Sequence, residues 1–375
     1  MRPTFAWLFV GLIVSGPASA DVYSASNYSD LVADINLADE NPGSTINLAA
    51  GAYSGAALPY ITATMTFNAT GGPAILDTAP TGDKGILTVP SADVPSTVVN
   101  VSLTVNGLTF ENAAISSADG GNGAGIRDQS TEGSLTVIDS TFLNNQDGIL
   151  TGGDGAQDLA VSISNSLFVN NGAPDGFEHA IYILGQSLDV TDSTFCGTVG
   201  GHDIKSRAAI TTVTNSTLYD GALDPDASTG CTAGSTSYAN DLPNGGQATI
   251  DGDQLIQDTF SPNHAIVSYG EEGLAFSSNS FIVSNDTFTS AIAGIGIQDP
   301  GCPVPVQLSN TTFSSLLTPV NPSDCVTTAV IQPIDEPNSW WVVIGAILGM
   351  GALQFWRTRT AKISPAQFRG AVCDA

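Results

Sequence analysis

The sequence predicts an all-β protein, a single-stranded right-handed parallel β-helix in which the chain winds as a solenoid. Three observations predict it: a strand-and-turn pattern recurs along the chain, its copies are unevenly spaced, and no helical periodicity fills the gaps. One copy cannot bury its own apolar side chains, whereas stacked copies bury a continuous column. The repeat therefore determines the expected fold class.

Residues 1–20 are predicted to form a signal peptide. A positive charge precedes an apolar run, and the segment ends in small residues that suit cleavage after Ala20. The β-helix domain is expected over residues 21–330. An exported chain meets an oxidising compartment, in which disulfides are allowed.

The mature chain is predicted to open on a short amphipathic helix. Tyr28, Leu31, Val32 and Ile35 share one helical face, and a turn then leads into a strand at residues 45–53. The helix would cap the open end of the first coil, whose backbone groups otherwise lack partners.

The repeat combines an alternating apolar strand with an Asx or Gly and a later Phe or Leu. The clearest copies are residues 103–110, 135–142, 161–168 and 188–195. The Asx or Gly that ends the strand of each copy is called its punctuating residue. These residues follow one another in steps of 23 to 38 residues and are Gly107, Asp139, Asn165, Asp192, Asn215, Asp253, Asn285 and Asn310. Asx and Gly tolerate left-handed backbone at a turn. An antiparallel sandwich or barrel is the alternative, but it would need hairpins in series, so the pattern favours roughly ten parallel coils.

Four cysteines fall in the exported part. The spacing favours Cys196 with Cys231 and Cys302 with Cys325, because each pair would lie about one coil apart. Four cysteines allow three pairings, and free buried thiols are the alternative.

The C-terminal segment is predicted to be a membrane anchor. Residues 340–356 are seventeen uncharged residues, preceded by an acidic linker at 331–339 and followed by a basic cytoplasmic tail at 357–375. Together with the signal peptide, this helix predicts an exported protein held at the cell envelope or displayed on the cell surface.

The exported part is strongly acidic. Residues 21–338 hold four cations against thirty-five acids, a formal charge of −31, which argues against a nucleic-acid partner. No cofactor is assigned. Calcium is the candidate considered, because the Asp-rich and Gly-rich loops at 117–123 and 152–155 offer carboxylates and carbonyls, the ligands that it takes. No calcium-binding sequence motif is present, so turns without metal are the preferred interpretation and no metal ligand is assigned.

Rare polar residues gather between residues 171 and 273, including all three histidines and two of the four exported cations. If the isoleucines at 126, 149, 181 and 204 face inward, strand alternation places Arg127, Leu150, Tyr182 and Lys205 in one outer column. Asp203 and Arg207 are expected to flank Lys205, and Asp241 and Tyr269 to continue the column. His179 and His202 are expected at the strand edge or interior.

Such a surface suits a lyase that acts on a uronic-acid polymer. The reaction needs a cation for the substrate carboxylate, a base for the C5 proton and an acid for the leaving oxygen. Arg207 or Arg127 fits the first role, Lys205 or a histidine the second, and Tyr182 or Tyr269 the third. The candidate catalytic residues are Tyr182, His179, His202, Lys205, Arg207 and Asp241, and the candidate substrate-binding residues are Arg127, Asp203, Asn244, His264, Tyr269 and Glu271.

Two other interpretations of these residues are open. A hydrolase could use a carboxyl pair, either Asp203 with Asp241 or Glu271 with Glu272. Alternatively, the cations form surface ion pairs, and the surface binds carbohydrate without proton transfer.

Several runs carry a resemblance to known proteins. Residues 175–290 contain His-Ala-Ile-Tyr, Gly-His-Asp-Ile-Lys-Ser-Arg, Asp-Leu-Pro-Asn-Gly-Gly and Tyr-Gly-Glu-Glu-Gly. These runs resemble a group of bacterial right-handed parallel β-helix proteins, and the N-terminal opening resembles pectate-lyase-like proteins. The resemblance implies a shared fold and a shared site but names no substrate.

The segment from Asp335 to Arg359 resembles the PEP-CTERM sorting signal of bacterial surface proteins, which implies an exosortase as partner. Asp335 replaces the first proline of that motif, and sixteen residues follow Arg359. A plain single-span anchor is therefore the alternative.

The expected function is binding of an extracellular polysaccharide, with β-elimination as the reaction if the site is catalytic. The alternative is a non-catalytic surface protein that serves adhesion or a biofilm matrix.

Overall fold

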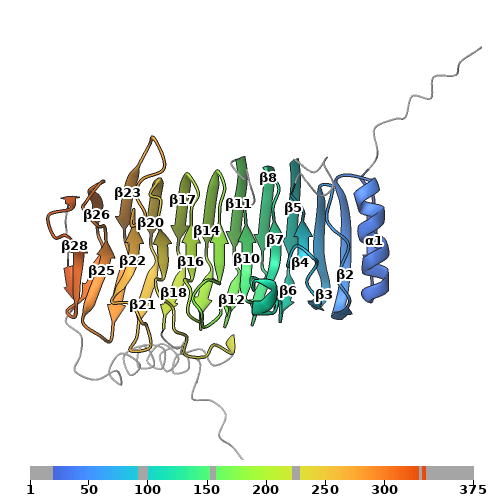
Figure 1. Cartoon of the computed structure of the whole chain (residues 1–375), viewed down its shortest axis with the longest axis horizontal. Coiled ribbons are helices and arrows are strands. Elements are labelled where there is room, and N and C mark those ends of the chain that lie inside the picture. The colour runs from blue at the N-terminus through green and yellow to red at the C-terminus, as the bar shows by residue number, and fades with distance from the viewer. Residues whose placement is uncertain (1–19, 92–99, 153–157, 222–228, 329–331, 335–375) are drawn as a thin grey trace, which may run out of the picture. The chain divides into compact units, whose positions relative to one another are not determined.

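The computed structural model describes residues 20–91, 100–152, 158–221, 229–328 and 332–334. In the unit that ends at Pro333, one helix stands at the N-terminal end of a long stack of strands (Figure 1). The strands form a 21-stranded sheet and a nine-stranded sheet.

The helical elements are α1 (Tyr28–Glu40) and the short 3-10 helix η1 (Ser117–Asp119). The 21-stranded sheet contains β1 (Val22–Ala25), β2 (Ser44–Gly55), β3 (Met65–Thr78), β5 (Asn100–Asn106), β6 (Leu108–Glu111), β8 (Glu132–Ile138), β9 (Thr141–Leu143), β11 (Asp158–Ser164), β12 (Leu167–Val169), β14 (Ser187–Thr191), β15 (Thr194–Cys196), β17 (Ile210–Thr214), β18 (Thr217–Asp220), β20 (Gln247–Asp251), β21 (Gln254–Gln257), β23 (Ser280–Ser284), β24 (Thr287–Ser290), β26 (Val306–Ser309), β27 (Thr312–Ser314), β29 (Val326–Thr328) and β30 (Gln332–Ile334). The nine-stranded sheet contains β4 (Gly85–Val89), β7 (Ala124–Asp128), β10 (Asp147–Thr151), β13 (Ile181–Ile183), β16 (Ile204–Ser206), β19 (Asn240–Leu242), β22 (Ala265–Tyr269), β25 (Gly294–Gln298) and β28 (Leu317–Asn321).

Strands one coil apart pair in parallel, in register. β11 lies between β8 and β14, with Val161 level with Leu135 on one side and Leu188 on the other. In the nine-stranded sheet, β13 lies between β10 and β16 in the same way. The predicted parallel stacking is therefore confirmed, and the antiparallel alternative is wrong.

The phenylalanines that end successive repeats form a stack inside the coils. The ring centroids of Phe110, Phe142, Phe168 and Phe195 follow one another at 5.0, 4.7 and 4.5 Å, and all four side chains are fully buried. This spacing matches the distance of about 4.8 Å between hydrogen-bonded strands, so each ring packs on the ring of the next coil.

The punctuating residues adopt the left-handed backbone that the repeat predicts. Asp139, Asn165 and Asp192 have φ values of 51°, 47° and 51°. Asp253 is a correction, because Gly252 (φ 77°) occupies the left-handed position there and Asp253 is the residue after it. The Asp253 carboxylate instead accepts a hydrogen bond from the Ser216 amide at 2.6 Å inside the turn.

The N-terminal helix covers the end of the stack as expected. Asn27 caps α1 by accepting a hydrogen bond from the Asp30 amide at 3.0 Å. Leu31 and Ile35 are fully buried, whereas Tyr28 and Val32 of the predicted face are only half-buried. The helix packs on β1 and β2, the first strands of the stack.

Two disulfides join neighbouring coils. Cys196 is bonded to Cys231, and Cys302 to Cys325, whose Cα atoms lie 5.9 and 5.5 Å apart. These are the pairs that the sequence spacing favours.

The predicted end segments lie almost wholly outside the described residues. This holds for the signal peptide up to residue 19, the membrane helix at 340–356 and the basic tail at 357–375. Strand β30 falls within the predicted linker at 331–339. Within the described part of the chain, no helix has the length and apolarity needed to cross a membrane.

Candidate functional site

The outer face of the nine-stranded sheet carries the predicted column. Level with one another on successive strands β7, β10, β13, β16 and β19 are Arg127, Leu150, Tyr182, Lys205 and Asp241. The alternation within short strands places them there because their neighbours, such as Ile181 and Ile204, fill the interior.

Four of the candidate residues converge in what we call the Tyr182 cluster, made of Tyr182, Lys205, Arg207 and Asp241. Arg207 Nε donates a hydrogen bond to the Tyr182 hydroxyl at 2.9 Å. Arg207 and Lys205 each lie 5.8 Å from the centroid of the Tyr182 ring. Lys205 Nζ also lies 3.6 Å from Asp241 Oδ2. One phenol hydroxyl, two cations and one carboxylate therefore meet on a single surface.

Arg207 is held in place by partners from the next coils. Its Nη1 and Nη2 atoms donate to the Glu272 carboxylate at 2.7 and 2.8 Å, and Nη1 also donates to Asn244 Oδ1. The hydrogen bond with Glu272 raises the pKa of Arg207, and the same contact lowers the pKa of Glu272. A guanidinium has five N–H groups, so these contacts leave one N–H on Nη2 for a further partner.

Two histidines and a tyrosine form a buried wall beside the cluster. The ring of His202 stacks between those of His179 and Tyr238, with centroids 4.8 and 5.4 Å apart. Burial, followed by the charges of Lys205 and Arg207, lowers the pKa of His202 to about 3. Burial likewise lowers the pKa of His179 well below its usual range. Both rings are neutral at pH 7, and they position Tyr182 and Asp241 by packing against them.

Asp241 is nearly buried at the centre of this wall, with 5% of its side chain exposed. Burial raises the pKa of Asp241 to about 6, although Lys205 acts in the opposite direction. Glu271 contacts this wall at Tyr238. Its Oε2 accepts hydrogen bonds from the Tyr238 hydroxyl at 3.1 Å and from the Ser268 hydroxyl at 3.2 Å.

Two predicted site residues lie inside the coil, so their expected placement is wrong. Asp203 precedes β16, and its carboxylate turns inward to accept a hydrogen bond from Thr198 Oγ1 at 2.6 Å. Tyr269 is fully buried and donates to the Gly246 carbonyl at 2.7 Å. Ser268, not Tyr269, is the residue level with Asp241, so the expected alternation was one residue out of step.

Two other predicted residues lie on the surface but away from the cluster. Arg127 is two strands from Tyr182, a separation of about 10 Å, and the Gln129 amide lies within 3.2 Å of its Nε. His264 is exposed before β22, four residues short of the cluster level and hence about 13 Å away along the strand.

The carboxyl pairs of the hydrolase interpretation do not face each other. Asp203 points into the coil while Asp241 lies on its outer wall. Glu271 contacts Tyr238, whereas Glu272 contacts Arg207.

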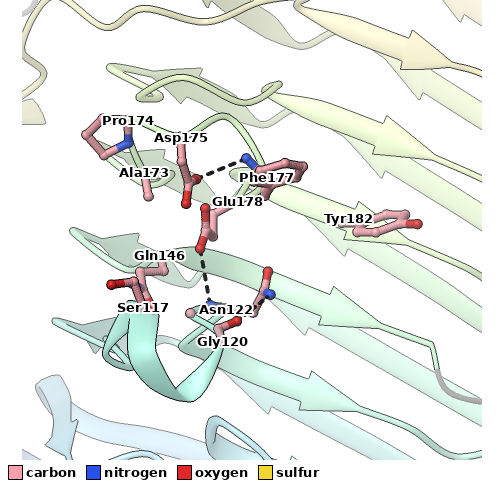
Figure 2. Close-up of a pocket in the computed structure, with 11 residues that line it drawn as sticks. Ser117, Gly120, Asn122, Gln146, Ala173, Pro174, Asp175, Phe177, Glu178 and Tyr182 are labelled. Carbon is pink, nitrogen blue, oxygen red and sulfur yellow. Dashed lines mark hydrogen bonds between the residues drawn. The ribbon is translucent and has the colours of Figure 1, made fainter.

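A pocket of about 760 Å³ opens next to the Tyr182 cluster (Figure 2). Its walls are the loop around η1, the loop before β13 and Tyr182 itself. Phe177 and Glu178 line this pocket and are not among the site residues predicted from the sequence. The partner loop lies 56 residues earlier in the chain, so no local signal could have joined the two.

The loops at 117–123 and 152–155 are the calcium candidates of the sequence, with turns without metal as the preferred interpretation. Among the described residues, the one cluster with metal-ligand spacing is Asp299, Cys302 and Cys325, whose two cysteines are already joined in a disulfide. Of the loop at 152–155, only residue 152 is described.

Replacing Asp203 by asparagine is expected to reduce the pH dependence of stability. Burial raises the pKa of Asp203 to about 8, so the folded state keeps a proton that the unfolded state loses near pH 4. The stability that this group contributes is greatest below pH 4 and falls as the pH rises to about 8. Between pH 7 and 8, the free energy of unfolding of D203N relative to wild type should rise by about 1 kcal/mol, measured by urea titration.

The exposed Asp189→Asn variant serves as the control and should follow wild type at both pH values. Equal slopes for wild type and D203N would show that Asp203 is ionised in the folded protein.

Comparisons with solved structures place the fold among known proteins. An alginate lyase from Paenibacillus sp. is 16% identical, with 85% of this chain and 97% of the lyase aligned at a TM-score of 0.53. A pectate lyase (14% identical, 87% and 81% aligned, TM-score 0.42) and the A-module of a mannuronan C-5 epimerase from Azotobacter vinelandii (13% identical, 85% and 98% aligned, TM-score 0.40) are also similar. The similarity to the alginate lyase shows the fold, a right-handed parallel β-helix. Neither a protein-family model nor a curated protein matches the chain.

Proposed function

We propose that this protein binds an extracellular polysaccharide on the outer face of its nine-stranded sheet and cleaves it at a uronate unit by β-elimination. The observation that carries the proposal is the Tyr182 cluster, in which a phenol hydroxyl and two cations meet beside an open pocket. The activity of the structurally similar alginate lyase makes polyuronates the first polymers to test.

Each step of the reaction has a residue suited to it. The remaining Nη2 hydrogen of Arg207 binds the substrate carboxylate and stabilises the charge that develops there. Lys205 Nζ acts as the base, takes the proton from C5 and carries it as an ammonium. The C4–O4 bond breaks, its electron pair leaves on O4, and a C4–C5 double bond forms. The Tyr182 hydroxyl gives its proton to O4.

Existing contacts would stabilise both charges that the reaction leaves on the protein. Lys205 becomes an ammonium 3.6 Å from the Asp241 carboxylate. Tyr182 becomes a phenolate that accepts the hydrogen bond from Arg207 Nε at 2.9 Å. The hydrogen bond to the phenolate is charge-assisted and therefore one of the stronger kind. Burial lowers the pKa of both His179 and His202, which favours Lys205 over a histidine as the base.

Binding without cleavage is the second candidate, and a specific observation favours it. Lys205 is paired with Asp241, and Arg207 with Glu272, so both cations are already neutralised in the free protein. A surface of this kind can hydrogen-bond carbohydrate in an adhesion or matrix role without moving a proton.

We further propose that the protein acts at the cell envelope. The signal-like residues 1–20 support export, and the uncharged residues 340–356 support anchoring. Processing of this C-terminal segment by an exosortase is the specific mode of anchoring to test. The formal charge of −31 over residues 21–338 makes nucleic acid an unsuitable partner.

Incubation of the full-length protein with a panel of uronate polymers, with and without calcium, separates the two candidates. Elimination is expected to produce ultraviolet absorbance from unsaturated ends. Retention of the protein on an immobilised polymer without new absorbance would support binding alone. If no polymer is either cleaved or bound, the proposal is wrong.

A further inference from the structure

The pocket beside Tyr182 is built from two loops that lock together. Glu178 Oε1 accepts a hydrogen bond from the Asn122 amide at 3.3 Å, which joins the loop before β13 to the loop around η1 (Figure 2). A Cβ atom on Gly121 would lie 2.5 Å from the same oxygen, so the glycine leaves room for the Glu178 carboxyl in this position. Gln146 braces the second loop through hydrogen bonds with Ile115. The pocket is therefore a formed site on the β-helix surface.

The second oxygen of Glu178 faces the carboxyl group of Asp175 and has no N–H or hydroxyl donor among the described residues. Only 3% of Glu178 is exposed, and the residue lines the pocket. A buried carboxyl oxygen without a hydrogen-bond donor destabilises the folded protein, and more so when the group is charged. A ligand that donates a hydrogen bond to this oxygen would remove that destabilisation.

The charge of the pocket selects among ligands. Its lining includes two carboxyl groups, Asp175 and Glu178, while the Lys84 ammonium donates a hydrogen bond to the carbonyl of the lining residue Gly120 at 3.1 Å. Burial and the neighbouring Asp175 raise the pKa of Glu178. An anionic sugar would be repelled by these groups, whereas an ammonium would pair with them.

An exposed aromatic ring stands at the edge of the pocket. Phe177 is 74% exposed, although the large apolar side chains of the coils are mostly buried. Asp175 Oδ1 accepts a hydrogen bond from the Phe177 amide at 3.2 Å, which fixes the turn that presents the ring. A flat apolar ring beside polar groups is suited to stack on the C–H face of a pyranose.

We propose that this pocket binds an amino sugar with a free amine, placed next to the uronate unit at the Tyr182 cluster. The ammonium pairs with Glu178 and Asp175, and the sugar ring stacks on Phe177. Tyr182 lines the pocket and belongs to the cluster, so adjacent units of one polymer would occupy the two sites. The placement of a uronate unit at the Tyr182 cluster rests on the proposed function. The substrate class that follows is a mixed polymer of uronate and amino sugar.

Calorimetric titration of the full-length protein with short oligomers of glucosamine tests the pocket directly. The amine oligomers are expected to bind, and their N-acetylated counterparts to bind at least about tenfold more weakly, because the acetamide carries no charge. Glu178→Gln should weaken binding of the amine oligomers by about tenfold or more, and Phe177→Ala by about tenfold. Phe177 is exposed, so its variant should fold normally, and Asp189→Asn is the matched control for a lost carboxylate far from the pocket.

Three results would overturn the inference. Equal affinity for the acetylated oligomers would remove the role of the amine, and unchanged binding by both variants would remove the role of the pocket. Calcium alone binding to wild type but not to Glu178→Gln would make the pocket a cation site instead.

The titration does not depend on cleavage, so the two proposals can fail separately. Amine oligomers that bind through Glu178 while no uronate polymer is cleaved would refute only the lyase. Cleavage of a polyuronate by a protein that ignores amine oligomers would refute only the amino-sugar pocket.

Discussion

Replacing Lys205 by methionine is expected to lower the rate of uronate cleavage by about 10²–10⁴-fold, the usual effect of losing a catalytic base. Methionine keeps an unbranched apolar side chain but removes the amine, which lies over the Tyr182 ring and takes the C5 proton. Tyr182→Phe should lower the rate by a similar factor, because it removes only the hydroxyl that protonates O4. The measurement is the initial rate at which unsaturated ends form.

The structure supplies a control for each variant. Removing Lys205 leaves the nearly buried Asp241 without its cation, so Lys205→Met is also made together with Asp241→Asn. Thr212→Ala, on an outward-facing strand position of the other sheet, should keep the wild-type rate. Cleavage at the wild-type rate by both Lys205→Met proteins would rule out Lys205 as the base.

Replacing Phe168 by alanine is expected to lower the free energy of unfolding by about 3–5 kcal/mol. Its ring is fully buried and stacks on Phe142 and Phe195, so its loss opens a cavity in the middle of the coil stack. Hydrogen-bonded strands on both sides limit how far the walls can collapse into that space. Urea unfolding followed by circular dichroism measures the change.

Phe177→Ala is the matched control, because it removes the same ring from a position that is 74% exposed. Its free energy of unfolding should stay within about 0.5 kcal/mol of wild type. If Phe168→Ala is no less stable than Phe177→Ala, the stacked rings do not hold the coils together.

The sequence alone determined the winding of the chain. Alternating apolar residues specify which face of a strand is buried, and a one-residue slip would expose all of them, so the register follows from the pattern. This is why the alignment of Tyr182 with Lys205 could be predicted from the isoleucines at 181 and 204. The left-handed turn at Asn165 and Asp192 follows equally locally, because few residues tolerate that backbone.

Only the tertiary structure decided which way side chains point at the ends of strands and which loops contact one another. Side-chain alternation holds within a strand, and β16 begins at Ile204, so Asp203 could turn inward against the expected pattern. The partners of Arg207 come from loops of later coils, and the contact between Glu178 and Asn122 joins residues 56 positions apart. Distances between loops depend on their lengths and packing in three dimensions, and no periodicity in the sequence encodes them.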